Sequence, residues 1–324
     1  MKNYDLVIVG AGPAGLGCAI SAIKRKFNLL LIDKGNIVNS IINFPTNMVF
    51  FSTSDVLELD NIPFNSREIR PNRVEAIKYY QSLSRHYNIP VETNAQVDSV
   101  TKKEGVFTIG YYQYAKRFYI SSRAVIIATG FYDNPNLLGV QGENLSHVSH
   151  YYKEAFQHYN QDVVVVGGKN SAVEAALDLH RHGARVTLIH RKSEIGESVK
   201  YWVMPDIMNR INEGSIKTSL NTTVTEILSD HIRVREKSDQ KEIKENAVYL
   251  LTGYHPDTRL VQSSGVEFDL ASLESKVDQS SLESNVENLF LAGSLVAGRN
   301  ANKIFIENSR EHGEKILNYL ETQI

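Results

Sequence analysis

Apolar residues along the chain fall into short continuous runs and longer segments with helical spacing. The short runs are rich in Val, Ile and Leu, which is typical of strands buried in a parallel sheet. They occupy positions 6–9, 28–32, 125–127, 163–166, 185–189, 248–251 and 289–294. Helices are predicted at about 13–24, 171–180 and 303–320. This alternation of strands and helices predicts an α/β fold.

Two of the strands end in a glycine-rich turn that opens a helix. The first turn is Gly10-Ala11-Gly12-Pro13-Ala14-Gly15, and the second is Gly167-Gly168-Lys169-Asn170-Ser171-Ala172. Each turn can offer backbone N–H groups and a helix N-terminus to the pyrophosphate of a dinucleotide. Two such units predict two Rossmann-like dinucleotide-binding domains and transfer of hydride between the two nucleotides.

The residues that follow the next strand of each unit differ in charge. Asp33 lies about 20 residues beyond the first glycines, where a carboxylate binds a ribose 2′-OH and repels a 2′-phosphate. This site therefore suits FAD or NAD, and Lys34 is a further candidate contact. The matching position of the second unit is basic, with His190, Arg191 and Lys192. Because arginine offers two donors to a phosphate, the second nucleotide is expected to be NADPH rather than NADH.

The second predicted helix carries signals at both ends. Ser171 and Glu174 have the S-x-x-E spacing of a capping box at its start. Gly183 is placed to end it as a C′ residue. The basic residues at 180–182 are expected to form a solvated cationic helix end, which the helix dipole favours. No metal site is predicted.

Two further strands stop at Thr-Gly, and each is followed within a few residues by a proline. These pairs are Thr129-Gly130 and Thr252-Gly253. We interpret them as the two crossings between domains, which would form a hinge. The predicted parts are a FAD-binding domain formed by residues 1–130 and 255–324 and an NADPH-binding domain inserted at residues 134–252.

The last predicted helix, at 303–320, has an apolar stripe suited to docking on the protein core. Its N-terminus holds Lys303 and Ile304. A helix dipole aimed at the pyrimidine ring of a flavin would stabilise the negative charge of the reduced form. Both residues are therefore candidate FAD contacts.

Composition excludes several classes of protein. The chain has 324 residues, 42% of them hydrophobic and 22% charged, which suits a globular protein with two domains. A net charge of −2 gives no electrostatic reason to expect nucleic acid or an anionic membrane as partner. No stretch approaches the ~20 apolar residues that span a bilayer. Asp5 interrupts the apolar N-terminus, so no signal sequence is predicted and a cytoplasmic location is expected.

Cys18 is the only cysteine. An internal disulfide, a Cys-x-x-Cys pair and a zinc cluster are therefore excluded. Cys18 lies inside the first predicted helix, where a small residue packs helix against strand. We expect an inert core cysteine.

The order of these motifs resembles the low-molecular-weight thioredoxin reductase group of flavoproteins that bind two dinucleotides. A FAD fingerprint is followed by Ala-Thr-Gly, an inserted NADPH fingerprint with His-Arg-Lys, and Leu-Phe-Leu-Ala-Gly, so the resemblance covers essentially the whole chain. Thioredoxin reductases carry a Cys-x-x-Cys pair just before the NADPH unit. The corresponding stretch here, 146–153, has no cysteine. Dithiol relay to thioredoxin is therefore excluded.

Within that group the chain resembles the bacillithiol-disulfide reductase family. The segments that carry this resemblance are 50–59, 149–155, 167–172 and 303–308. The resemblance implies that hydride passes from NADPH to FAD and on to a small-molecule disulfide, that of bacillithiol, in a homodimer. It also implies further site residues, which are Asn43, Thr46, Phe51, Val97, Thr129, Gly130, Gly293 and Ser294 for FAD and Tyr254 for NADPH.

Three positions depart from the family pattern. Some members carry a cysteine at the place of Ala14, proposed to receive electrons from the flavin. Ser294 replaces the aspartate that commonly binds the ribityl chain. Lys169 replaces a glycine of the second fingerprint, where it either turns aside or supplies a cation to the phosphate. We predict flavin-centred chemistry and name no catalytic side chain.

Three functional classes stay open at this point. The first is a reductase of a small-thiol disulfide. The second passes single electrons to ferredoxin or flavodoxin, as thioredoxin reductase-like proteins without the cysteine pair can. The third is a flavin redox sensor that signals by domain rotation. A flavin monooxygenase is disfavoured because Gly142 precedes His147 by one residue too many for the Gly-x-x-x-His signature.

Overall fold

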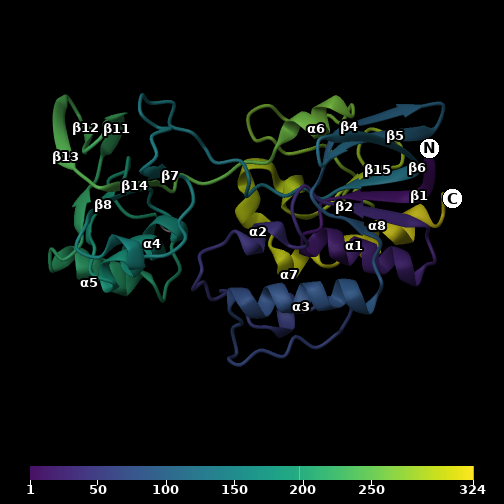
Figure 1. The fold of residues 1–324 in the computed structure, drawn as a ribbon, viewed down its shortest axis with the longest axis horizontal. Helices are drawn as coiled ribbons and strands as arrows, with labels where there is room; N and C mark the ends of the chain where they lie inside the picture. The colour runs from purple at the N-terminus through teal and green to yellow at the C-terminus, as the bar shows by residue number, and fades with distance from the viewer. Residues whose placement is uncertain (197, 324) are drawn as a thin grey trace. The chain divides into compact units, whose positions relative to one another are not determined.

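The computed structural model describes residues 1–196 and 198–323, and the chain divides into two compact units (Figure 1). The first unit consists of Met1–Asn43, Met48–Asn134 and the chain from Tyr254 onward. The second consists of Pro135–Gly253 together with the short segment Phe44–Asn47. The chain therefore crosses between the units at 43/44 and 47/48 as well as at 134/135 and 253/254.

The first unit is built on a seven-stranded sheet in the order β3-β2-β1-β6-β5-β4, with β15 pairing β6. Its strands are β1 (Lys2–Val9), β2 (Leu29–Ile32), β3 (Val91–Glu92), β4 (Ala95–Lys103), β5 (Val106–Gln113), β6 (Lys116–Ile127) and β15 (Leu289–Leu291). Strands β3, β2, β1 and β6 pair in parallel in that order, and β15 pairs in parallel with β6. Strands β4, β5 and β6 pair antiparallel. Strand β2 and the last four residues of β1 and of β6 are buried, as their continuous apolar runs require.

Helices cover this sheet in Figure 1. They are α1 (Pro13–Lys24), α2 (Asn39–Ile42), α3 (Arg73–His86), α6 (Thr258–Ser263), α7 (Ile306–Ser309) and α8 (His312–Leu320), with the short 3-10 helices η1 (Asp55–Leu57) and η3 (Gly293–Lys303). A capping box starts α3, because the Asn72 side chain accepts from the Glu75 N–H and the Glu75 carboxylate accepts from the Asn72 N–H. Helix α1 spans the predicted residues 13–24 and has Pro13 at its first position.

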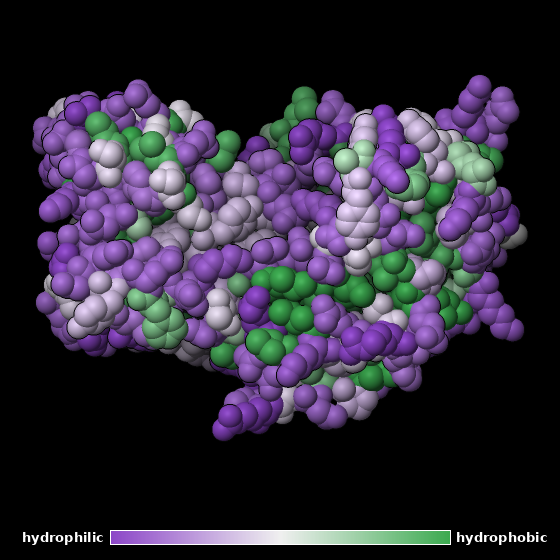
Figure 2. Space-filling model, in the orientation of Figure 1, coloured by the Kyte–Doolittle hydropathy of each residue, from purple (hydrophilic) through white to green (hydrophobic). Residues whose placement is uncertain are grey.

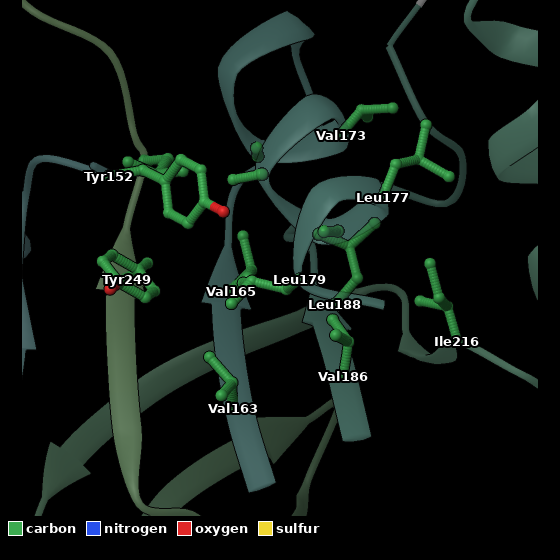
Figure 3. Close-up of a cluster of buried hydrophobic side chains, with 14 of the residues drawn as sticks. Tyr152, Val163, Val165, Val173, Leu177, Leu179, Val186, Leu188, Ile216 and Tyr249 are labelled. Atoms are coloured by element: carbon green, nitrogen blue, oxygen red, sulfur yellow. The ribbon is translucent and has the colours of Figure 1, made fainter. Parts of the chain in front are cut away.

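The second unit contains a five-stranded parallel sheet in the order β10-β9-β8-β14-β7. Its elements are β7 (Val148–Ser149), η2 (Phe156–His158), β8 (Asp162–Val166), α4 (Asn170–Arg181), β9 (Arg185–Ile189), α5 (Met204–Asn212), β10 (Lys217–Ser219) and β14 (Ala247–Leu250). Strands β11 (Thr222–Ile227), β12 (His231–Glu236) and β13 (Asp239–Lys244) form a separate antiparallel sheet. Figure 3 shows α4 packed on the sheet through buried residues such as Val165, Val173 and Leu188.

The capping box predicted for the second helix is wrong. Helix α4 starts one residue earlier, with Lys169 as an extended N-cap that makes no side-chain cap bond. Ser171 therefore lies inside the first turn. The Asn170 side chain binds the backbone of a nearby loop, accepting from the Lys200 N–H at 2.9 Å and donating to the Ser198 oxygen at 3.0 Å. These contacts shift the helix start. At the other end, Gly183 has φ +86° beyond the C-cap His182, as predicted.

The single C-terminal helix predicted at 303–320 is also wrong. Asn308 accepts from the Phe305 N–H and donates to the Lys303 oxygen, which ends η3 and begins the four-residue helix α7. Arg310 and Glu311 then separate α7 from α8. The expected apolar stripe is nonetheless buried on α8, at 316, 317 and 320. Because α7 is one turn long, the proposed long-helix dipole at Lys303 has no support.

Candidate functional site

The first glycine turn connects β1 to α1, and its first and last glycines pack closely against neighbouring backbone. Gly10 has φ +109°, which residues with a side chain rarely adopt. A Cβ atom at Gly15 would lie 1.9 Å from the carbonyl oxygen of Gly10. A Cβ atom at Gly12 would meet nothing within 4 Å in the part of the chain that the structure describes. Gly12 is also the N-cap of α1, so the uncapped N–H groups of the first turn suit a pyrophosphate.

Asp33 is held beside this turn by two backbone N–H groups. Its Oδ2 accepts from Ala11 at 2.7 Å and its Oδ1 accepts from Gly35 at 2.8 Å. Burial raises the pKa of Asp33, and these two N–H groups oppose that rise. The orientation of the carboxylate is therefore fixed before a ribose arrives. Lys34 lies alongside and pairs with Asp133 at 2.9 Å.

Four residues predicted to contact FAD come together at the carboxyl ends of the first sheet. Gly293 follows β15 with φ +70°, and a Cβ atom there would lie 2.9 Å from the Cβ of Ala14. Gly130 follows β6, and a Cβ atom there would lie 3.8 Å from the Ser294 hydroxyl. Ligands of open α/β sheets bind outside the carboxyl ends of the strands. The convergence is therefore in the place where a dinucleotide is expected.

Other predicted contacts are spread over the two units. The Asn43 carbonyl accepts from the Tyr132 hydroxyl at 3.2 Å, and the Tyr132 and Tyr254 ring centroids lie 4.8 Å apart. Tyr254, predicted for NADPH, thus packs within the first unit. Thr46, predicted for FAD, belongs to the second unit, where its N–H donates to the Lys153 carbonyl at 2.8 Å.

The remaining predicted FAD residues lie in the first unit. Val97 is on β4 and packs against the core beneath the sheet. Thr129 lies after β6, with its backbone nitrogen beside Gly10. Lys303 ends η3 with its ammonium 3.9 Å from Glu274, and Ile304 follows it half-buried. Thr129 thus lies at the first glycine turn, whereas Val97 and Lys303 make their contacts with other parts of the unit.

Two segments that carry the family resemblance meet in the first unit. The Ser52 hydroxyl donates to the Glu307 carboxylate on α7, and the Arg310 guanidinium donates to the Asp55 carbonyl at 3.1 Å. Phe50 is buried and Phe51 is half-buried. Figure 2 shows an apolar surface in the region of α7, whose N-cap Phe305 is 52% exposed. Residues 50–55 and 305–310 therefore form one continuous region.

The second glycine turn connects β8 to α4 and is covered by protein. A Cβ atom at Gly168 would lie 2.4 Å from the His190 ring, so this ring stands directly over the turn. The Gly168 carbonyl accepts from the Gly196 N–H at 2.9 Å. Together with the Asn170 contacts to Ser198 and Lys200, this bond fixes residues 196, 198 and 200 against the N-terminus of α4.

The basic residues after β9 are exposed. Arg191 and Lys192 extend into solvent next to His190. Partial burial lowers the pKa of His190, and the charges of Arg191 and Lys192 lower it further. His190 is therefore neutral at pH 7. The positive charge available to a phosphate comes from Arg191 and Lys192.

Glu174 was assigned only a capping role in the sequence, and the structure gives it another environment. It lies on α4 in the second turn of the helix, and burial raises its pKa to about 7, opposed by the charge of Lys200. A carboxyl group that titrates near neutrality beside a nucleotide-binding turn is a candidate functional group. Its polar character among the buried alanines of the helix was the available signal.

Cys18 is fully buried within α1. Burial raises the pKa of its thiol to about 12. A thiol is a nucleophile only as the thiolate. Cys18 therefore cannot attack a disulfide at neutral pH.

The described residues offer neither a cluster of metal ligands nor a membrane-spanning helix. In residues 1–196 and 198–323 no group of three or more His, Cys, Asp or Glu side chains is arranged to hold a metal ion. Among the helices of this described part of the chain, none is long and apolar enough to cross a membrane.

Comparisons with known proteins cover the whole length of the chain. The family model described as pyridine nucleotide-disulphide oxidoreductase matches residues 7–293. The bacilliredoxin reductase Bdr of Bacillus subtilis is 41% identical over 98% of this chain and 97% of its own. The solved bacillithiol disulfide reductase Bdr (YpdA) from Bacillus cereus is 37% identical, with a TM-score of 0.98 over 100% of both chains. Thioredoxin reductase from T. acidophilum shares the fold, with a TM-score of 0.79 over 100% of this chain and 99% of its own at 22% identity.

Proposed function

The chain belongs to the pyridine nucleotide-disulphide oxidoreductases and, within them, to the Bdr family, and from this premise we propose that it reduces bacillithiol disulfide with NADPH through bound FAD. Membership confirms the resemblance predicted from the sequence. It also confirms the α/β fold with two dinucleotide-binding domains. An oxidoreductase of this family uses a flavin and NAD(P)H.

The first unit is the proposed FAD site. Gly12 leaves room for a pyrophosphate, and the Asp33 carboxylate is fixed by Ala11 and Gly35 in an orientation that can accept a ribose hydroxyl. A half-buried carboxylate at this point also repels a 2′-phosphate. These observations support FAD here rather than an NADP-type nucleotide.

The second unit is the proposed NADPH site. Arg191 and Lys192 are exposed cations after β9, where a 2′-phosphate is expected. His190 stays neutral and covers Gly168, so its ring must move aside for a pyrophosphate to reach the N-terminus of α4. The charges of Arg191 and Lys192 support NADPH over NADH.

In the half-reaction that reduces the acceptor, no thiolate of this chain is available. When bound, FAD accepts a hydride from NADPH and passes two electrons to the acceptor. With a disulfide as acceptor, one NADPH and one proton break the S–S bond and yield two thiols and NADP⁺. Cys18 is buried and protonated, and Ala14 stands where some relatives have a cysteine. We propose that the disulfide is reduced at the flavin itself.

The single observation that carries the proposed reduction of bacillithiol disulfide is the full-length similarity to Bdr proteins. The burial of Cys18, the only cysteine, supports reduction at the flavin itself. We propose in addition a cytoplasmic homodimer, on analogy with the thioredoxin reductase group. Sedimentation at several concentrations tests the dimer.

Stopped-flow spectroscopy tests the proposed function. The flavin is reduced anaerobically with NADPH and then mixed with bacillithiol disulfide, ferredoxin or oxygen. We expect bacillithiol disulfide to reoxidise it fastest. Faster reoxidation by ferredoxin would support a single-electron reductase instead, and failure of NADPH to bleach the flavin would leave the redox sensor.

A further inference from the structure

We propose that His312 is a positioning residue for FAD, because its imidazole fixes the backbone of Gly293 against Ala14. This inference rests on the proposed FAD site. His312 is the first residue of α8 and is only 8% exposed. Its Nδ1 accepts the backbone N–H of Gly293 at 3.1 Å. Because an N–H group can only donate, Nδ1 carries no proton, and the neutral ring holds its proton on Nε2.

Helix α8 gives this imidazole a rigid base. A Cβ atom at Gly313 would lie 2.7 Å from the Gly17 carbonyl oxygen and 2.9 Å from the Cα of Cys18. The backbones of α8 and α1 are therefore in direct contact. Glu314 adds a second tie, since its carboxylate accepts from the Ser21 hydroxyl at 2.8 Å and pairs with Arg25 at 2.7 Å. His312 is thus anchored to α1, the helix that begins at the first glycine turn.

Gly293 donates the backbone N–H that His312 accepts, and its position determines what this hydrogen bond holds in place. Its φ of +70° turns the chain sharply after β15, and the position of a Cβ atom there is 2.9 Å from the Cβ of Ala14. The next residue, Ser294, places its hydroxyl beside Gly130. The bond to His312 therefore sets how closely the 293–294 turn approaches the start of α1. Both sides of this approach are proposed to contact FAD.

The surroundings of His312 keep its imidazole neutral, which the hydrogen bond from the Gly293 N–H requires. Burial, and to a lesser extent the charge of Lys315, lowers the pKa of His312 to about 4. A protonated ring would present a donor to the Gly293 N–H and lose the bond. Loss of the acceptor would leave a buried N–H unpaired, which favours a rearranged turn. A rearranged turn no longer matches the flavin nucleotide.

Substitution of His312 separates positioning from simple packing. The carbonyl oxygen of His312→Asn takes roughly the place of Nδ1 and can accept from Gly293, whereas His312→Ala offers no acceptor. We measure the dissociation constant of FAD from reconstituted apoprotein by flavin fluorescence, and the thermal midpoint of each apoprotein. His86→Ala, at an exposed histidine of α3, is the matched control.

We expect His312→Ala to weaken FAD binding about tenfold, whereas His312→Asn and the control stay within about threefold of the parent. The proposal is overturned if His312→Ala binds FAD as the parent does, or if His312→Asn folds yet binds as weakly as His312→Ala. Should His312→Ala not fold, His312→Gln replaces it with the same two outcomes, since its carbonyl lies one bond further out. An unsubstituted apoprotein that does not bind FAD would instead refute the proposed function.

Discussion

The two glycine turns follow the same strand-turn-helix plan but are completed differently. The first turn is open at Gly12, and the acidic residue beside it is already fixed by backbone N–H groups. The second turn is covered by His190 and strapped by the loop that carries Gly196. A prosthetic group that stays bound suits the preformed site, and a substrate that enters and leaves suits the covered one. Local sequence therefore determines the conformation of each turn, whereas residues distant in sequence determine whether the turn is open or covered.

The largest effect is expected within the first turn. Gly15→Ala places a Cβ atom 1.9 Å from the Gly10 carbonyl oxygen, whereas Gly12→Ala places one in open space. We expect Gly15→Ala to lower the free energy of unfolding of the apoprotein by about 3 kcal/mol. Gly12→Ala should leave that stability unchanged and weaken FAD binding. Urea unfolding and flavin fluorescence measure both, and equal stability losses would contradict the preformed cradle.

His312 binds Gly293 beside Ala14 of the first turn, and His190 covers the second turn. Both have a lowered pKa, and the pH dependence of stability tests the state of His312. The pKa of His312 is lowered from 6.5 to about 4 in the folded protein, so the unfolded chain binds a proton first as the pH falls. Its contribution to stability is present above pH 6.5 and is lost towards pH 4, by about 2 kcal/mol between pH 7 and pH 5. Comparing urea unfolding of the parent and His312→Asn isolates this loss. Parallel pH profiles would contradict a buried neutral imidazole.

The charge of the second turn should determine nucleotide choice. Arg191→Ala is expected to raise the KM for NADPH about tenfold and leave that for NADH nearly unchanged, because only NADPH carries the 2′-phosphate. Arg181→Ala removes an exposed cation from the C-terminal end of α4 and serves as control. Steady-state kinetics with both nucleotides measures the difference. An equal rise in both KM values would remove the argument for the 2′-phosphate.

Sequence alone predicted the elements whose signals are local. Helix 13–24 and strand 185–189 agree with α1 and β9 residue for residue, because proline, glycine and apolar runs act over a few positions. The division of 303–320 into separate helices involves the Asn308 contacts at the start of α7 and the close approach of Gly313 on α8 to Gly17. The second of these lies across some 300 residues of chain, where no local pattern can reveal it.

For the candidate site, too, local patterns predicted some residues and missed others. The residues of the glycine turns and the charges after β2 and β9 were predicted from spacing. His312 was missed because it looked like an ordinary residue of a predicted helix, and its bond to Gly293 exists only in the folded chain. Glu174 was misjudged because its spacing from Ser171 fits a capping box, whereas burial decides its protonation. The hydrogen bond of His312 and the raised pKa of Glu174 both depend on the folded environment, which a local sequence pattern does not contain.

The central claim is that electrons pass from the flavin to a disulfide without a thiolate of this protein. Cys18→Ala removes the only sulfhydryl of the chain. The most direct measurement is anaerobic reoxidation of the NADPH-reduced flavin by bacillithiol disulfide, followed by stopped-flow absorbance in the parent and in Cys18→Ala at equal flavin content. We expect rate constants within about twofold of each other, since the Cys18 thiol is buried and protonated. Loss of reoxidation in Cys18→Ala with its flavin still bound would contradict it.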